Sequence, residues 1–345
     1  MASVRSLTTR YKTPMDMPDA TSRSGLAAAF AALREELSRC IIGQSALVER
    51  LLIALLADGH LLVEGAPGLA KTTAVKELAA RIEGDFHRIQ FTPDLLPADL
   101  TGTEIYRPQQ GSFEFQRGPI FHNLLLADEV NRAPAKVQSA LLEAMGERQV
   151  TVGRTTYALP QLFLVMATQN PIEQEGTYPL PEAQLDRFLM HVRVDYPDGA
   201  AEAAILRLAR ERARTALHDA IVPARVLSQS QIFAAREEVL TLHLAPALEE
   251  YVVQLTLASR AGRMYGEDLA RWIAYGASPR GTIAIDRCAR AHAWLAGRDF
   301  VAPEDVHTVA HDVLRHRILL SYEAEAEGVT PDKVIDALLA RVPLP

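Results

Sequence analysis

A glycine-rich turn between an apolar strand and a helix places the tightest constraint on how this chain folds. Residues 65–72 read Gly-Ala-Pro-Gly-Leu-Ala-Lys-Thr and follow the apolar run 61–63. The phosphate-binding P-loop, Gly-x-x-x-x-Gly-Lys-Ser/Thr, surrounds phosphates with backbone N–H groups and the N-terminus of the following helix. The first glycine, the lysine and the threonine match, whereas Ala70 occupies the second glycine position. The alternative is a plain turn that joins a strand to a helix.

If the loop binds a nucleotide, its residues divide the work. Lys71 is expected to reach the β- and γ-phosphates, and the Thr72 hydroxyl to hold Mg²⁺. The residues predicted to bind the nucleotide here are Gly65, Ala66, Pro67, Gly68, Leu69, Ala70, Lys71, Thr72 and Thr73.

A second motif lies downstream, where the apolar run 124–127 ends in Asp128 and Glu129. Ligands of open α/β sheets bind at the carboxyl ends of parallel strands, so an acidic pair there fits a nucleotide site. Asp128 is expected to help hold Mg²⁺, and Glu129 to polarise the attacking water. Asn170 follows another apolar run and is the predicted polar sensor. The alternative for the acidic pair is a solvated turn at a strand end.

Composition and charge limit the class of protein. Of 345 residues, 48% are hydrophobic and 23% charged, which is normal for a soluble globular protein of two domains. The formal net charge of −7 argues against sequence-independent binding to nucleic acid. The longest apolar run, 51–57, is too short to span a bilayer, and residues 1–22 lack the apolar segment of a secretory signal. We therefore expect a cytoplasmic protein with a disordered N-terminal tail over residues 1–24.

Cysteine and histidine patterns predict no metal site. Cys40 and Cys288 lack the spacing of a disulfide framework or zinc site, and the ten histidines are scattered. Cys288 shares a helical stripe with apolar neighbours, so we expect it to be a buried core thiol.

Apolar strands that alternate with helices predict the architecture. Helical spacing covers 24–57 with a break at 41–44, and further helices are expected at 71–82 and 133–147. Short apolar runs predict strands at 60–64, 86–91, 123–128, 162–167 and 188–194. Since parallel strands need helical crossovers, this order predicts an α/β fold with three αβα layers around a parallel five-stranded sheet.

Two segments interrupt the alternation and predict β-hairpin inserts. One covers 101–121 with a turn around 108–111, and the other covers 148–160 with a turn at Gly153-Arg154. Beyond 196–199 the strand signals end and a helical, proline-broken sequence follows. We expect a nucleotide-binding core at 25–198, a linker helix region at 199–222 and a smaller all-α lid domain at 223–345.

Together these motifs resemble the AAA+ superfamily, and specifically its MoxR family. The resemblance covers about residues 25–340. It rests on Ile42-Gly43-Gln44 and on segments 64–73, 91–97, 128–134, 167–171, 176–188 and 276–280. Ala70 departs from the general P-loop pattern but matches the usual form of this family.

The resemblance implies further roles. Asn170 corresponds to the sensor-1 residue, which holds the attacking water. Arg187 resembles the arginine finger that reaches a neighbouring subunit's nucleotide, and Arg280 resembles the sensor-2 arginine at the start of a lid helix. The loop Ile41-Ile42-Gly43 matches the segment that packs on adenine. A guanidinium suits the roles of Arg187 and Arg280 because its planar donors match phosphate charge. The alternatives are a salt bridge for Arg187 and a solvated helix face for Arg280.

The family also implies partners and an activity. It implies a homo-oligomer, with a hexameric ring as the family expectation. The implied activity is that of an ATP-hydrolysing chaperone or remodelling motor with ATP and Mg²⁺. It would act on protein clients with a von Willebrand factor A (VWA) domain partner, in complex maturation or in metal or cofactor insertion. The aromatic and basic hairpin residues either contact a partner or stabilise the hairpins: Phe113, Phe115, Tyr157, Arg117 and Arg154.

Three other functions stay open. One is a magnesium-chelatase-like motor subunit, and another is a nucleic-acid translocase or helicase of the same AAA+ branch. The net charge makes nucleic acid the less favoured partner. The third is a nucleotide-gated scaffold without turnover, which the complete set of Lys71, Asp128, Glu129, Asn170 and Arg187 disfavours.

Overall fold

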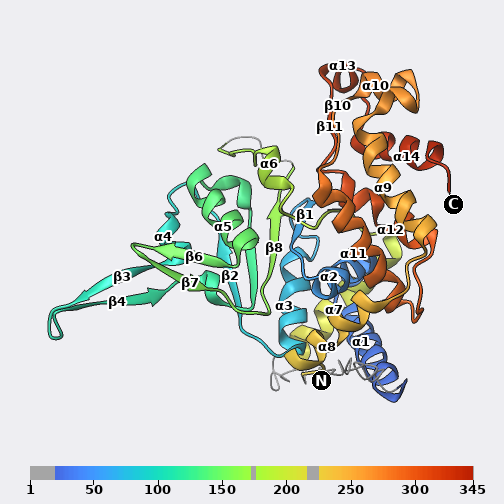
Figure 1. The fold of residues 1–345 in the computed structure, drawn as a ribbon. Helices are drawn as coiled ribbons and strands as arrows, with labels where there is room; N and C mark the ends of the chain where they lie inside the picture. The colour runs from blue at the N-terminus through green and yellow to red at the C-terminus, as the bar shows by residue number, and fades with distance from the viewer. Residues whose placement is uncertain (1–19, 172–175, 216–224, 345) are drawn as a thin grey trace, which may run out of the picture.

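A five-stranded parallel sheet forms the centre of the molecule (Figure 1). The computed structural model describes residues 20–171, 176–215 and 225–344. The strand order is β2-β5-β8-β1-β9. The strands are β1 (Leu61–Gly65), β2 (Phe86–Gln90), β5 (Leu124–Asp128), β8 (Leu164–Gln169) and β9 (Met190–Val194). The predicted α/β class is therefore confirmed, and each predicted strand lies within two residues of its expected ends.

Helices cover both faces of the sheet, as the three-layer prediction requires. They are α1 (Ala20–Cys40), α2 (Ser45–Leu56), α3 (Lys71–Arg81), α4 (Pro97–Thr101), α5 (Ala135–Glu147), α6 (Glu182–Leu185) and the 3₁₀ turns η1 (Pro119–Phe121) and η2 (Val130–Arg132). Strand side chains alternate between two cores. In β5, Leu124 and Leu126 pack on the side of α1–α3, whereas Leu125 and Ala127 pack on the side of α4 and α5.

The two hairpin inserts form where the sequence predicts them. β3 (Gly102–Arg107) pairs with β4 (Ser112–Arg117), and β6 (Gln149–Val152) pairs with β7 (Thr155–Ala158). Figure 1 shows β3–β4 extending well away from the body of the molecule. The Phe115 and Tyr157 rings stack across the two hairpins, with centroids 4.1 Å apart, so these two residues stabilise the inserts. Phe113 differs because it is 68% exposed.

Within 199–215 and 225–344, the chain forms helices and one short strand pair. It forms α7 (Gly199–Thr215), α8 (Gln229–Thr241), α9 (Pro246–Arg260), η3 (Gly262–Met264), α10 (Glu267–Trp272), α11 (Pro279–Leu295), α12 (Pro303–Leu314), α13 (Tyr322–Ala326) and α14 (Pro331–Arg341). The antiparallel pair β10 (Ile273–Tyr275) and β11 (Leu319–Leu320) was not expected. In the described residues, no helix has both the length and the apolar character to cross a membrane.

Two finer predictions have different outcomes. Cys288 is fully buried, as expected, and burial raises the pKa of its thiol to about 12. The predicted N-terminal tail is partly wrong, because α1 starts at Ala20. Residues 1–19 of that tail lie outside the described part of the chain.

His60 joins the start of β1 to neighbouring elements through a neutral imidazole. The Val165 backbone N–H donates to His60 Nδ1 at 3.0 Å, and His60 Nε2 lies 3.4 Å from the Met145 carbonyl oxygen. Burial, and then the charge of Arg148, lower the pKa of His60 to about 4. The His60 imidazole is therefore neutral in the folded protein at pH values between about 4 and 6.5, where the same group in the unfolded chain binds a proton.

This burial predicts a loss of stability in mild acid. As the pH falls from 6.5 towards 4, the unfolded state gains a proton on His60 that the folded state does not, so the free energy of unfolding should fall by up to about 3 kcal/mol. His60→Gln retains a donor and an acceptor but does not titrate, so its urea midpoint should depend less on pH over this range. Equal pH slopes for the two proteins would contradict the prediction.

Candidate nucleotide-binding site

The glycine-rich loop connects the carboxyl end of β1 to the N-terminus of α3. Residues 67–73 line a cavity of about 650 Å³, a size typical of ligand sites. Ala70 has φ 58°, a left-handed conformation that costs a non-glycine residue roughly 1–2 kcal/mol. A glycine would adopt this conformation without that cost, which explains the general P-loop pattern in physical terms.

Lys71 spans this loop. Its side chain is largely buried, and Nζ donates to the carbonyl oxygens of Gly65 and Ala66, the latter at 3.1 Å. Burial lowers the pKa of Lys71, while the charges of Asp128, Glu129 and Glu64 oppose that change. The result is a cation held at the base of the cavity, where it suits a phosphate.

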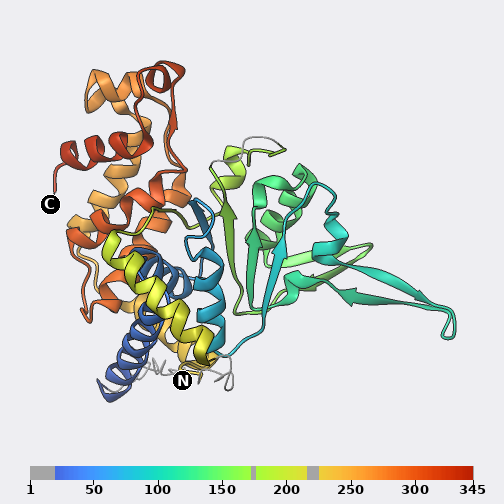
Figure 2. The same cartoon turned by 180° about the vertical axis from the view of Figure 1, so that it is seen from behind.

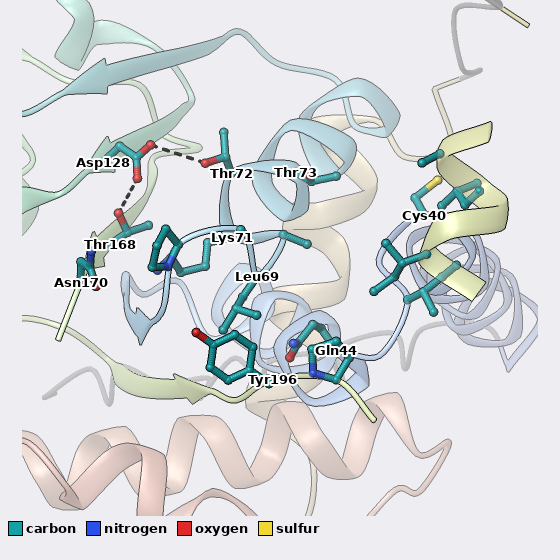
Figure 3. A pocket seen from close by; sticks show the side chains of 18 of the residues that line it. Cys40, Gln44, Leu69, Lys71, Thr72, Thr73, Asp128, Thr168, Asn170 and Tyr196 are labelled. Carbon is teal, nitrogen blue, oxygen red and sulfur yellow. Dashed lines mark hydrogen bonds between the residues drawn. The ribbon is translucent and has the colours of Figure 1, made fainter. Parts of the chain in front are cut away.

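Asp128 is the centre of a hydrogen-bond network at the end of β5 (Figure 3). Its Oδ1 accepts from the Thr168 hydroxyl at 2.5 Å, and its Oδ2 lies 3.5 Å from Thr72 Oγ1. Arg88 of β2 also donates to Oδ2, from Nη2 at 2.7 Å. The Thr72 and Asp128 oxygens are the hard donors that Mg²⁺ prefers, so this pair fits the predicted metal.

Glu129 is held in a strained conformation beside Asp128. Its φ is 57°, and its backbone N–H donates to Thr168 Oγ1 at 2.9 Å. Its carboxylate accepts from Gln90 Nε2 at 2.7 Å and pairs with Arg132. A non-glycine residue keeps a positive φ only where its surroundings enforce it, and such residues concentrate at functional sites.

Other residues that line the cavity are apolar or aromatic and suit the base of a nucleotide. Ile42, Cys40 and Tyr196 line it, together with Ile205 and Leu208 of α7. In Figure 2, α7 crosses in front of the N-terminal helices. α7 is anchored to α3, because Arg212 Nη2 donates to Glu77 at 3.0 Å.

Most of the predicted nucleotide residues meet at this cavity. Ile42, Asp128, Glu129 and Asn170 line it with loop residues 67–73. Four predicted residues are not among those that line it: Ile41, Gly43, Gly65 and Ala66. Ile41 is buried in the core, and Gly43 packs on Pro197 and Ala201.

The two predicted arginines lie elsewhere. Arg187 and Arg280 line a second hollow, formed by the start of β1, the end of α5 and the start of α11. Arg187 Nη1 donates to the Leu142 carbonyl oxygen at 2.8 Å, and Arg280 Nη1 lies 3.7 Å from Asp186 Oδ2. The structure therefore does not bring either arginine to the nucleotide cavity of its own chain.

Several residues of the site were not predicted from the sequence. Thr168 orients both carboxylate residues, yet it had no assigned role within the segment 167–171. Arg88 and Gln90 contact the acidic pair from β2. Their alternation with the buried Ile89 was an available signal, because alternate strand residues share a face.

Comparison with known proteins supports the class that this geometry indicates. Residues 60–190 match the model of the ATPase family associated with various cellular activities (AAA), and residues 267–338 match the AAA lid domain. A crystal structure of a protein from Cytophaga hutchinsonii, described as a candidate ATPase, superimposes with a TM-score of 0.87. It is 46% identical, and the match covers 94% of this chain and 97% of that one. The fold is that of an AAA+ ATPase with its lid.

The sequence relatives narrow the class. Chaperone MoxR1 of Mycobacterium tuberculosis is 48% identical over 314 residues, which are 90% of this chain and 81% of that protein. MoxR of Paracoccus denitrificans is 38% identical, with coverage of 90% and 94%. A magnesium-chelatase subunit of Nicotiana tabacum is more distant, at 31% over 56% of this chain and 42% of its own length. This chain belongs to the MoxR family of AAA+ ATPases.

The position of Thr168 predicts a specific defect. Thr168→Val keeps the side-chain shape but removes both hydrogen bonds, leaving the Glu129 N–H unsatisfied at a cost of roughly 1–3 kcal/mol. We expect phosphate release from ATP to slow by about tenfold or more, because a Glu129 that leaves its position no longer aligns the attacking water. Thr168→Ser retains the hydroxyl and should stay near the wild-type rate. Wild-type turnover in the valine variant would contradict this role.

Proposed function

We propose that this protein binds Mg²⁺–ATP in the cavity at the carboxyl edge of the sheet and hydrolyses it to ADP and phosphate. The observation that carries the proposal is the convergence of Lys71, Thr72, Asp128 and Glu129 on one cavity. The P-loop backbone and Lys71 bind the phosphates. Thr72 and Asp128 would hold Mg²⁺, which would neutralise phosphate charge when bound.

The remaining residues of the cavity orient the attacking water and contact the adenine base of the nucleotide. Glu129 accepts a proton from the water, and its pairing with Gln90 keeps the carboxylate at a fixed position. Asn170 is a second polar group that lines the cavity, and Figure 3 shows it on the side of Thr168 and Asp128. Ile42 and α7 supply the apolar surface on which adenine packs.

We further propose that the active unit is a ring, with six subunits as the family expectation. Arg187 and Arg280 line a hollow separate from the nucleotide cavity. In a ring, this hollow would face the nucleotide of the next subunit. An arginine in that position stabilises charge that develops on the transferred phosphoryl group.

The work of the motor is proposed to be remodelling of protein clients in the cytoplasm, with a VWA-domain partner, in complex maturation or cofactor insertion. A relative named as a chaperone, at 48% identity, supports this class. The projecting hairpin β3–β4 carries Glu104 and Glu114 against Arg107 and Arg117, so it offers no excess positive charge to nucleic acid. The distant match to magnesium chelatase supports a shared motor more than a shared substrate.

A hydrolysis-blocked variant tests both the chemistry and the client. Glu129→Gln should lower phosphate release by about a hundredfold or more while nucleotide affinity changes little, because the carboxylate acts on water and not on ATP. With ATP present it should retain client and VWA protein in a pull-down, whereas Lys71→Ala, which does not bind ATP, should not. Loss of nucleotide binding in Glu129→Gln would overturn the assignment, and stimulation by DNA or RNA would favour a translocase.

The arginine finger has its own test. Arg187→Ala should leave nucleotide binding to each subunit intact but lower turnover by about three orders of magnitude, the lower end of the range for arginine fingers. Arg263→Ala, an exposed arginine in η3, is the matched control. Normal turnover by assembled Arg187→Ala, with assembly followed by sedimentation velocity, would refute the role.

A further inference from the structure

The hollow that contains Arg187 and Arg280 is unusually rich in arginine, and we call it the arginine hollow. Its volume is about 420 Å³. Five arginines line it against two aspartates: Arg148, Arg187, Arg280, Arg287, Arg317, Asp58 and Asp186. His60 also lines it and stays neutral near pH 7, because burial lowers its pKa to about 4.

Both carboxylates in the arginine hollow already have partners. Arg148 Nη2 pairs with Asp58 at 2.5 Å, and Arg317 Nε pairs with Asp186 at 2.8 Å. Arg280 lies further from Asp186, at 3.7 Å, and its side chain is 56% exposed. The arginine hollow therefore has three more guanidinium groups than carboxylates, so it attracts an anion.

Arg287 is the arginine of this group without an assigned role. It lies two turns after Arg280 on α11, so both side chains project from the same face of that helix. It is exposed and makes no hydrogen bond or ion pair with any other residue that the structure describes. Nearby arginines are different, since Arg290 pairs with Asp286 at 2.8 Å.

An apolar side chain lies between these two cations. Ile283 also lines the arginine hollow and is 53% exposed. A solvated helix face would ordinarily carry a polar residue there, whereas an isoleucine between two arginines fits a face that another protein covers. The same face thus offers apolar contact area and cationic donors for a phosphate.

We propose that Arg287 is a third arginine that contacts the terminal phosphates of the nucleotide bound by the neighbouring subunit, together with Arg187 and Arg280. This inference rests on the proposed ATPase ring. The ligand class is a polyphosphate presented by a second copy of this chain. The guanidinium supplies planar paired donors that match phosphate oxygens. Because Arg287 is exposed in the single subunit, its charge stays hydrated until a second subunit binds.

Mixed rings test whether Arg287 acts across the interface. Arg287→Ala subunits should bind ATP within about twofold of wild type, yet hydrolyse it about tenfold or more slowly, in the range for loss of one charge-assisted contact. Lys71→Ala subunits bind no ATP but still carry Arg287. Random mixing completes about one interface in four, so the mixture should recover about a quarter of the wild-type rate. A mixture no more active than its components would overturn the proposal.

Controls separate this inference from the proposed function. A mixture of Arg187→Ala and Lys71→Ala subunits tests whether Arg187 acts across the subunit interface, independently of Arg287. If that pair is not restored, the proposed ring mechanism fails. If it is restored and the Arg287→Ala mixture is not, only the Arg287 assignment fails. Arg263→Ala should retain wild-type turnover.

A charge-conserving variant distinguishes phosphate contact from a structural role. Arg287→Lys should assemble normally and hydrolyse ATP at a rate between those of Arg287→Ala and wild type, because an ammonium keeps the charge but loses the paired planar donors. Loss of assembly in both variants, measured by sedimentation velocity, would overturn the inference, since it would assign Arg287 to protein–protein contact.

Discussion

The burial of the parallel sheet on both faces is the constraint on which the site depends. Every residue of β5 is buried, and its backbone groups are satisfied by β2 and β8. A charged side chain within such a strand would pay a large desolvation cost without a partner. Asp128 meets this requirement as the last residue of β5, where it has partners at the carboxyl edge beside the P-loop. The same edge receives Thr168 from β8 and Arg88 from β2, and these two neighbours fix the Asp128 carboxylate.

A second polar cluster connects the lid to the core. Asp186 accepts from Arg317 Nε at 2.8 Å and from the Ser278 hydroxyl at 2.8 Å. Burial lowers the pKa of Arg317, and the charge of Asp186 opposes that change. Breaking a buried pair of this kind leaves a charge uncompensated, at a cost of about 3–5 kcal/mol. Because Arg187 follows Asp186 directly, the position of the predicted finger is coupled to the lid.

The sequence predicts the elements well where periodicity and turn chemistry agree. The five strands, the P-loop helix and both hairpin turns follow from local patterns. Apolar periodicity and turn glycines are properties of residues that are neighbours in the sequence. The N-terminal start of α1 was predicted four residues late, because its first turn lacks a strong apolar stripe. The β10–β11 pair was missed because its strands, of three and two residues, lie far apart in the chain.

The site divides in the same way. The P-loop and the acidic pair are short motifs of consecutive residues, so they can be predicted from the sequence. The contacts made by Thr168, Arg88 and Gln90 depend on which strands are neighbours in the sheet, and strand order is not a local property. Of the residues predicted to contact the base, Ile41 lies in the core whereas Ile42 lines the cavity, and no local pattern in the break at 41–44 distinguishes these two isoleucines.

The separation of the two charged surfaces also limits how copies of this chain can associate. The nucleotide cavity, once it holds a polyphosphate, is anionic, whereas the arginine hollow has an excess of guanidinium groups. A two-fold symmetric contact through either surface alone would oppose like charges. The proposed head-to-tail contact would instead place the arginine hollow of one subunit against the nucleotide of the next, and such heterologous contacts close into rings when the rotation allows. If the arginines of the hollow contact the neighbour's nucleotide, nucleotide binding favours assembly. Because coupling between two binding events is reciprocal, assembly should favour nucleotide binding by the same free energy.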